Sequence, residues 1–280
     1  AAILTIIINL YNSLKFTNNF ISDPNKFKNI VQTSLEYMTQ NNKNYFLASS
    51  STQVSSNLHK FLSRPHIDKH EEGVLLEAIK NDLEKNNFEP ILKFVSKHLN
   101  QSYFEWLIQG NFNIENTIHL IEHIQNQLHK ETLPVLDFFD YDVAKIPIHN
   151  YVYQFQSQDK ENDNSAIISY FQFGKLSEED KCKLLVIENA LQESFFDELR
   201  TQQSLGYYVN LSIYNHNRID GITCIIQSNV ESPEYIYKQI NSFFDEYHLE
   251  DLEDSEFKEY VTSVITNLKK KHLTIGDEFD

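Results

Sequence analysis

The second half of the chain alternates between two sequence periodicities, and their order restricts the fold more than any other feature of the sequence. Segments in which polar and apolar residues alternate, or in which β-branched and aromatic residues cluster, predict strands, whereas apolar residues three and four positions apart predict helices. The expected order is strand, strand, helix, strand, strand, helix, helix, over residues 150–158, 166–174, 176–203, 205–216, 221–229, 232–249 and 253–273. This order predicts an antiparallel sheet with helices packed on one face, which is an α+β fold.

The first half of the chain is predicted to be mostly helical. Asp23 is a candidate N-cap, and Pro24 follows it at the first helical position of a segment with one apolar face. Residues 49–65 are rich in serine, but their apolar residues keep helical spacing. One short strand is expected at residues 103–111, where aromatic and β-branched residues lead into a Gly-Asn pair.

A break in periodicity separates the two halves. Pro134, Pro147 and several aspartates interrupt the pattern between the last helix of the first half and the first strand of the second. We therefore expect a first domain over residues 1–130, a connection over residues 131–147 and a second domain over residues 148–280.

Composition excludes some classes of partner. The formal net charge of −16 repels phosphate backbones, so we expect no nucleic acid. The most apolar stretch, residues 3–10, is far too short to span a bilayer and lacks the features of a signal peptide, so we expect no membrane association. Cys182 and Cys224 lie in no metal-binding spacing, which favours a reducing compartment and a cytoplasmic protein.

His119-Leu120-Ile121-Glu122-His123 matches H-x-x-E-H, the zinc signature of inverted zincins. A helix would place His119 and His123 one turn apart, as a metal requires. However, the same helix has one apolar stripe, formed by Ile114, Ile118, Ile121, Ile124 and Leu128. Both histidines and Glu122 fall opposite this stripe, so we expect them to face water and to bind no metal. A free-standing zinc enzyme, with Glu188 or Glu193 as a further ligand, remains the alternative.

The stretch from Glu198 to Val209 carries a more specific signal. A long amphipathic helix ends in Leu-Arg-Thr, and Arg200 is the last strong charge before the chain turns through Gly206 into a strand. Tyr207 presents a phenol where that strand opens. Each residue also has a structural interpretation. An arginine stabilises the negative C-terminal end of a helix dipole, and a tyrosine in a strand often packs its ring while its hydroxyl stays in water.

Residues Phe196 to Val209 read F-x-x-L-R-T-x-x-x-L-G-Y-x-V, which resembles the signature in the C-terminal half of the insulinase/pitrilysin family of zinc metallopeptidases, most closely its insulin-degrading type. Residues 106–117, 150–174 and 221–229 are similar to neighbouring strands and a helix start of that family. Ser204 departs from the pattern, because the family usually has glutamine there.

The resemblance implies four homologous α+β domains that enclose a chamber, with the inverted zinc motif in the first. This chain would hold the end of the third domain and the start of the fourth, as two incomplete units of antiparallel sheet with helices on one face. The motif at His119 would then be accidental. Zinc would be bound by the N-terminal half of the same enzyme, and this fragment alone would be inactive.

The resemblance also implies roles at the site. Arg200 would hydrogen-bond a carbonyl of the peptide substrate or the tetrahedral intermediate, and Tyr207 would donate its hydroxyl to the developing oxyanion. Both residues are therefore candidate catalytic and substrate-binding residues, and we expect their side chains to share one concave edge. The alternative is a non-catalytic homologue that acts as a partner subunit or a peptide-binding module.

Overall fold

The computed structural model describes residues 24–64, 66–85, 89–90, 93, 101–102, 106–111, 113–128, 131–132, 142–157, 159–271 and 274. The chain divides into two compact units. Unit 1 comprises residues 1–42, 70–140 and 272–280, and unit 2 comprises residues 43–69 and 141–271. The domain boundaries drawn from the sequence stay a prediction.

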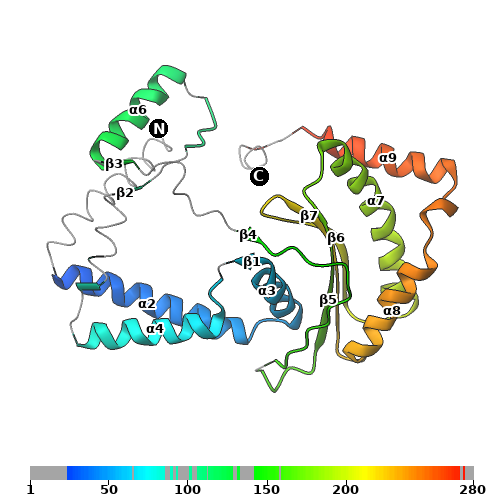
Figure 1. The fold of residues 1–280 in the computed structure, drawn as a ribbon, viewed down its shortest axis with the longest axis horizontal. Coiled ribbons are helices and arrows are strands. Elements are labelled where there is room, and N and C mark those ends of the chain that lie inside the picture. Colours follow the sequence, from blue (N-terminus) through cyan, green and yellow to red (C-terminus); the bar gives the residue numbers. More distant parts are fainter. Residues whose placement is uncertain are drawn as a thin grey trace. The chain divides into compact units, whose positions relative to one another are not determined.

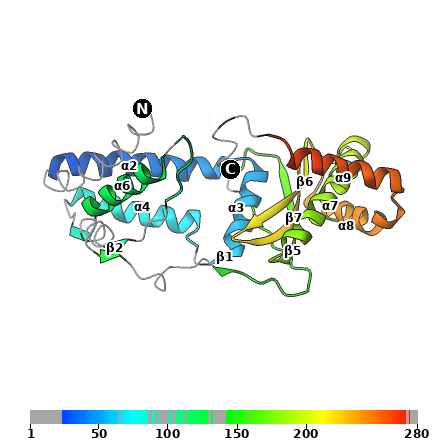
Figure 2. The same ribbon diagram turned by 90° about the horizontal axis from the view of Figure 1, so that it is seen from above.

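Unit 1 is mostly helical among its described residues. The long helix α2 (Pro24–Phe46) begins in this unit, and α4 (Lys69–Glu84) lies alongside it (Figure 2). Their apolar faces meet in a small cluster formed by Leu35, Leu76, Leu83 and the partly buried Val31. The remaining elements are α6 (Ile114–Leu128) and the two short parallel strands β2 (Gln101–Ser102) and β3 (Glu131–Thr132).

The strand expected at residues 103–111 is not found where the structure describes that segment. Residues 106–111 belong to no strand, and residues 103–105 lie outside the described residues. Leu107 is exposed, and residues 106–111 have no partner strand among the described residues. A short apolar run alone does not distinguish a strand from an irregular segment.

Unit 2 contains a three-stranded antiparallel sheet in the order β5-β7-β6 (Figure 1). The strands are β5 (Ser165–Gly174), β6 (Tyr208–His216) and β7 (Ile219–Ser228). The residues Asn217 and Arg218 join β6 to β7 with φ of 47° and 67°, the left-handed conformation of tight hairpin turns. A second, two-stranded pairing joins β1 (Ser63–Arg64) to β4 (Asp142–Val143).

The strand expected at residues 150–158 is wrong for residues 150–157. Among the described residues they pair with no strand, and β5 is bonded to β7 alone, so the expected hairpin with residues 166–174 does not form there. Tyr151, Val152 and Tyr153 are exposed, and Tyr153 instead contacts the Phe61 ring edge-on at 4.4 Å. Gln158 lies outside the described residues.

Helices cover both faces of this sheet (Figure 1 and Figure 2). On one face lie α7 (Glu178–Phe196), its π-helical extension η2 (Asp197–Gln202) and α8 (Pro233–Glu246), followed by the 3₁₀ turn η3 (Leu249–Asp251) and α9 (Asp254–Leu268). On the opposite face lies α3 (Ser50–Leu62). The expected α+β fold is confirmed, and α3 adds a second helical layer.

Local sequence explains where these helices begin. Ser177 caps α7 by accepting the Asp180 N–H, and three acidic residues follow in its first turn, where they favour the helix dipole. Ser232 caps α8 and is followed by Pro233 at the first helical position, as the sequence predicts. No helix formed by the described residues is both long and apolar enough to cross a membrane.

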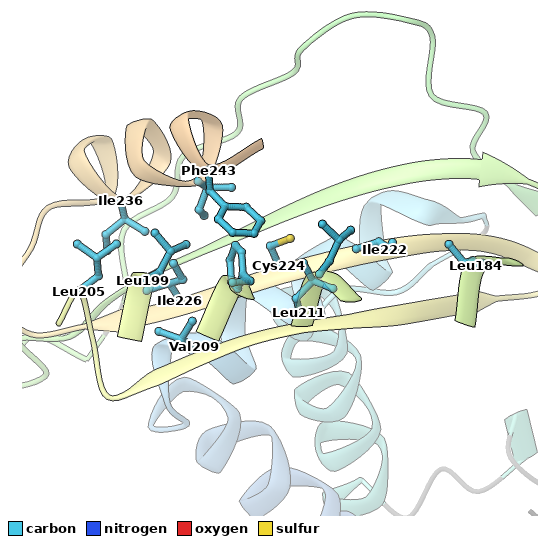
Figure 3. Close-up of a cluster of buried hydrophobic side chains, with 13 residues drawn as sticks. Leu184, Leu199, Leu205, Val209, Leu211, Ile222, Cys224, Ile226, Ile236 and Phe243 are labelled. Carbon is cyan, nitrogen blue, oxygen red and sulfur yellow. The ribbon is translucent and has the colours of Figure 1, made fainter. Parts of the chain in front are cut away.

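The main core lies between the sheet and the α7/α8 layer (Figure 3). Register places Val209 opposite Ile226 and Leu211 opposite Cys224, so these side chains face the helices together. Phe195 and Phe243 meet edge to face at 5.1 Å in the middle of this layer. Burial raises the pKa of the Cys224 thiol to about 12, so it stays protonated and serves as a packing group.

A buried histidine links α3 and β1 to the sheet. The Nε2 atom of His216 lies 2.8 Å from the Ser63 hydroxyl, and the His59 ring stands edge-on to it at 4.5 Å. Burial lowers the pKa of His216 below its usual value, and the neighbouring His59 lowers it further. The folded state therefore favours neutral His216.

This lowered pKa predicts a specific pH dependence of unfolding. Below about pH 6.5 the unfolded chain binds a proton at His216 more readily than the folded chain does, so stability should fall as pH falls. Urea unfolding at about pH 7.5 and about pH 5.5 measures this difference. His216→Gln should flatten the pH dependence, whereas His149→Gln, at an exposed position, should leave it unchanged. Equal pH dependence in all three proteins would contradict the assignment to His216.

Candidate functional site

The helix that leads into the candidate site changes its winding at its end. After Phe196 the α-helix α7 widens into the π-helix η2. The last hydrogen bonds run from Gln203 N–H to Glu198 O at 2.9 Å and from Leu205 N–H to Leu199 O at 3.0 Å. Short π-helical segments inside or at the end of α-helices occur frequently at functional sites.

Two buried leucines hold the turn that follows. Leu199, in η2, and Leu205, after it, are both fully buried in the core. Between them Ser204 adopts φ of 55°, the left-handed conformation that closes many helices. The turn is therefore fixed at both ends, and the residues beside the two leucines have defined positions.

Gly206 allows the chain to pass directly against β7. A Cβ atom built on Gly206 would lie 2.1 Å from the carbonyl oxygen of Gln227, which is closer than any side chain permits. Glycine has no Cβ and is therefore required where two backbones approach this closely. This contact sets the position at which the next residue, Tyr207, leaves the turn.

The two predicted site residues flank this turn. Arg200 lies in η2 with a half-buried side chain, and among the described residues that side chain has no hydrogen-bond or ion-pair partner. Tyr207 is 59% exposed, and its hydroxyl oxygen accepts a hydrogen bond from Nε2 of Gln227. The turn thus brings both residues to the junction of η2 and β6. That their side chains share one rim stays a prediction.

Gln227 is a residue of this site that the sequence patterns missed. It lies near the end of β7, is only 2% exposed, and also accepts the backbone N–H of Ser51 at 2.9 Å. The sequence signal is a polar residue at the end of the mostly apolar run from Gly221 to Ile226. Buried polar side chains are almost always hydrogen-bonded, so such a residue indicates a specific contact.

The H-x-x-E-H segment lies on α6 of unit 1. The His119 side chain is 80% exposed and its Nδ1 atom lies 3.5 Å from Glu122 Oε2, while His123 is also exposed. The expected apolar stripe is not buried at its start, because Ile114 and Ile118 are exposed. Its last members, Ile124 and Leu128, have side chains outside the described part of the structure.

Exposed imidazoles on one helix do not fit a zinc centre, which needs three or four ligands turned toward one point. In the described ranges, histidine, cysteine and carboxylate side chains form no group of three or more that suits a metal ion. Glu188, a further ligand in the alternative zinc enzyme, accepts the backbone N–H of Ile213 in unit 2. The described residues therefore do not fit a bound zinc ion.

Comparison with known proteins relates this arrangement to a family. A family described as "PQQ synthase PqqF-like, C-terminal lobe domain 4" matches residues 186–280. "Insulin-degrading enzyme-like 2" of Arabidopsis thaliana is 26% identical over 200 residues, which cover 68% of this chain and 21% of that protein. "Nardilysin" of Homo sapiens is 25% identical over 198 residues, or 69% of this chain and 17% of that protein.

Two further comparisons agree with these. "Putative zinc protease mug138" of Schizosaccharomyces pombe is 28% identical over 228 residues, which cover 80% of this chain and 23% of that protein. The crystal structure of pitrilysin has a similar fold, with a TM-score of 0.66 over 91% of this chain and 28% of that chain, at 18% identity. The chain spans about a fifth of the length of these relatives. The matches and the signature at Phe196 to Val209 together support an insulinase-family C-terminal region.

Proposed function

We propose that this chain is the end of the third and the start of the fourth domain of an insulinase-type zinc metalloendopeptidase. In this role it forms part of the wall of a chamber that encloses peptides and contacts the peptide at the scissile bond. The observation that carries the proposal is the Gly206 turn, which holds the exposed residue Tyr207 between η2 and β6. The zinc protease and insulin-degrading relatives support the reaction class.

Arg200 is proposed to grip the substrate. Its guanidinium has no hydrogen-bond or ion-pair partner in the described chain, so its donors are available for a peptide carbonyl. A planar guanidinium can offer two parallel N–H groups to an oxygen and keeps its charge at any physiological pH. That positive charge also stabilises the negative charge that develops on the oxygen in the tetrahedral intermediate.

Tyr207 is proposed to donate its hydroxyl proton to the same developing oxyanion. A hydrogen-bond donor accelerates the reaction when it is aimed at the place where charge appears in the transition state. The Tyr207 oxygen accepts a hydrogen bond from Gln227, and the tyrosine as a whole is 59% exposed. It can therefore meet a substrate without a change in the fold of the turn.

The zinc ion is proposed to belong to the N-terminal half of the same enzyme, because the described residues here do not fit it. When bound, zinc supplies an activated water for attack on the peptide carbonyl. Peptides and that N-terminal half are the proposed partners. Two free thiols, Cys182 exposed and Cys224 in the core, support a reducing compartment such as the cytoplasm.

Hydrolysis of a fluorogenic peptide tests this function. The 280-residue chain alone should neither cleave the peptide nor bind one zinc per chain, whereas the protein that also carries the N-terminal half should do both. In that longer protein, Arg200→Lys should lower kcat roughly tenfold or more, because an ammonium cannot reproduce the planar fork. Arg218→Lys, in the exposed hairpin turn, is the matched control and should be silent.

Two results would overturn the proposal. One is stoichiometric zinc on the 280-residue chain that disappears with His119→Ala. The other is unchanged peptide turnover in Arg200→Lys together with unchanged turnover in a variant that lacks the Tyr207 hydroxyl.

A further inference from the structure

We propose that Gln227 is the positioning residue that keeps the proton of the Tyr207 hydroxyl turned outward, available to the substrate. The inference rests on the proposed function of Tyr207. It concerns the direction of one hydrogen bond, between the buried amide of Gln227 and the exposed phenol. Two contacts of the described chain and the exposure of Tyr207 determine that direction.

The first contact fixes the orientation of the Gln227 amide. Its Oε1 atom lies 2.9 Å from the backbone nitrogen of Ser51. A backbone N–H can only donate, so the atom that faces it must be the amide oxygen and cannot be the NH₂ group. Ser51 stands in the first turn of α3, where the N–H groups have no partner within the helix, so this contact also satisfies α3.

The direction of the second hydrogen bond follows from the orientation of the amide. With its oxygen turned to Ser51, Gln227 presents its NH₂ group to Tyr207. An amide NH₂ donates and does not accept, so the tyrosine oxygen must be the acceptor. The hydroxyl proton of Tyr207 cannot point at Gln227 and has to be directed away from it.

The exposure of Tyr207 limits where that proton can be directed. Within the described residues, Gln227 is the one hydrogen-bond partner of the Tyr207 hydroxyl, and the tyrosine is 59% exposed. The proton therefore faces water or a bound substrate. A phenol that accepts one hydrogen bond also becomes a stronger donor of the next, because the two bonds polarise each other.

The close approach of the chain at Gly206 keeps this geometry from relaxing. The backbone of Gln227 touches Gly206, and the side chain of Gln227 touches the next residue. Gln227 thus positions the turn through its backbone, and it positions the Tyr207 hydroxyl through its side-chain amide.

Two substitutions of nearly equal size separate positioning from packing. In Gln227→Glu at about pH 8, the carboxylate still accepts the Ser51 N–H but can no longer donate, so the Tyr207 hydroxyl must donate to it. The proton is then trapped, and kcat of the longer peptidase should fall roughly 10²-fold, as far as in Tyr207→Phe. Gln227→Met removes both bonds but leaves the proton free, so kcat should fall only roughly three- to tenfold.

The order of the two effects is diagnostic. If Gln227 only supports α3, Met should be worse than Glu, because Met alone loses the Ser51 bond. Gln172→Glu is the matched control: on β5, Gln172 accepts the Ile146 N–H at 2.9 Å and donates to Ala144 O at 3.0 Å, so its amide is fixed in the same way. That variant should lose stability but keep kcat, provided that it is assayed below its unfolding temperature.

A second measurement needs no activity. Proton NMR of the 280-residue chain should show a new, slowly exchanging hydroxyl resonance in Gln227→Glu, because a charge-assisted bond to a buried carboxylate protects the proton. The resonance should be absent from the wild type and from the Tyr207→Phe/Gln227→Glu double variant. A protected Tyr207 hydroxyl proton in the wild type would overturn the role of Gln227, whereas full turnover in Tyr207→Phe would overturn the proposed function instead.

Discussion

Tyr207→Phe is expected to lower kcat of the peptidase that contains both halves by roughly 10²–10³, with little change in KM. This corresponds to about 2.7–4 kcal/mol of transition-state stabilisation. The substitution removes one hydroxyl and almost no volume, and the ring is exposed, so packing should change little. Steady-state kinetics over a range of peptide concentrations separates the effect on kcat from the effect on KM.

The neighbouring tyrosine provides the control for this experiment. Tyr208 opens β6, is 41% exposed and follows Tyr207 directly. Tyr208→Phe should leave kcat within about twofold of the wild type, because no role in the reaction is assigned to its hydroxyl. Tyr207→Phe also leaves one buried N–H of Gln227 unpaired, which should cost about 1–3 kcal/mol of stability and must be checked by thermal unfolding. Equal kinetics in both variants would remove Tyr207 from the mechanism.

Much of unit 2 could be predicted from local sequence signals. The cap at Ser232 with Pro233 after it, and the cap at Ser177 with an acidic first turn, predict α8 and α7 because they act within one helical turn. The strands β6 and β7 follow from their β-branched and aromatic residues. Each of these signals depends on neighbours along the chain, which a sequence displays directly.

The position of α3 could not be predicted in the same way. The helix itself follows from its apolar spacing, but its place on the free face of the sheet depends on contacts between distant residues. Ser50 Oγ donates to Asn164 O at 2.8 Å, and Ser51 N–H donates to Gln227 Oε1. The pattern of a single sequence contains no information on such pairs, because each partner reads as an ordinary polar residue.

At residues 150–157 the sequence predicts a strand that does not form. The polar and apolar residues of this segment alternate as in a strand, yet it pairs with no strand. Alternating polar and apolar residues indicate only that one side of a segment is buried and the other is exposed. A segment that packs its aromatic rings against a helix shows the same alternation without belonging to a sheet. The contact between Tyr153 and Phe61 is such a case.

The candidate site was predicted in part. Arg200 and Tyr207 were found through the family signature, and Gly206 through its place in a tight turn. The π-helical winding of η2 was not predicted. Over so short a segment, the spacing of apolar residues hardly differs between an α-helix, with hydrogen bonds between residues four apart, and a π-helix, with hydrogen bonds between residues five apart. Gln227 was missed because its two partners, Ser51 and Tyr207, approach it from different segments.

Phe195→Ala should produce the largest loss of stability of the substitutions considered for unit 2. Phe195 is fully buried and contacts Phe243 edge to face at 5.1 Å. Removing a buried phenylalanine typically costs about 3–5 kcal/mol, because the lost apolar contacts are accompanied by a cavity. Urea unfolding followed by far-ultraviolet circular dichroism measures the change in the free energy of unfolding.

The next residue is the matched control. Phe196 is 49% exposed, so Phe196→Ala should cost less than about 1 kcal/mol, although the substitution and the helix are the same. The comparison also tests the candidate site. Leu199 continues the buried face of α7, and Arg200 lies roughly a quarter turn from it, at the edge of the helix that meets solvent. Equal losses in the two phenylalanine variants would mean that the helix is rotated, and a rotated helix would turn Arg200 away from the position that the proposed function requires.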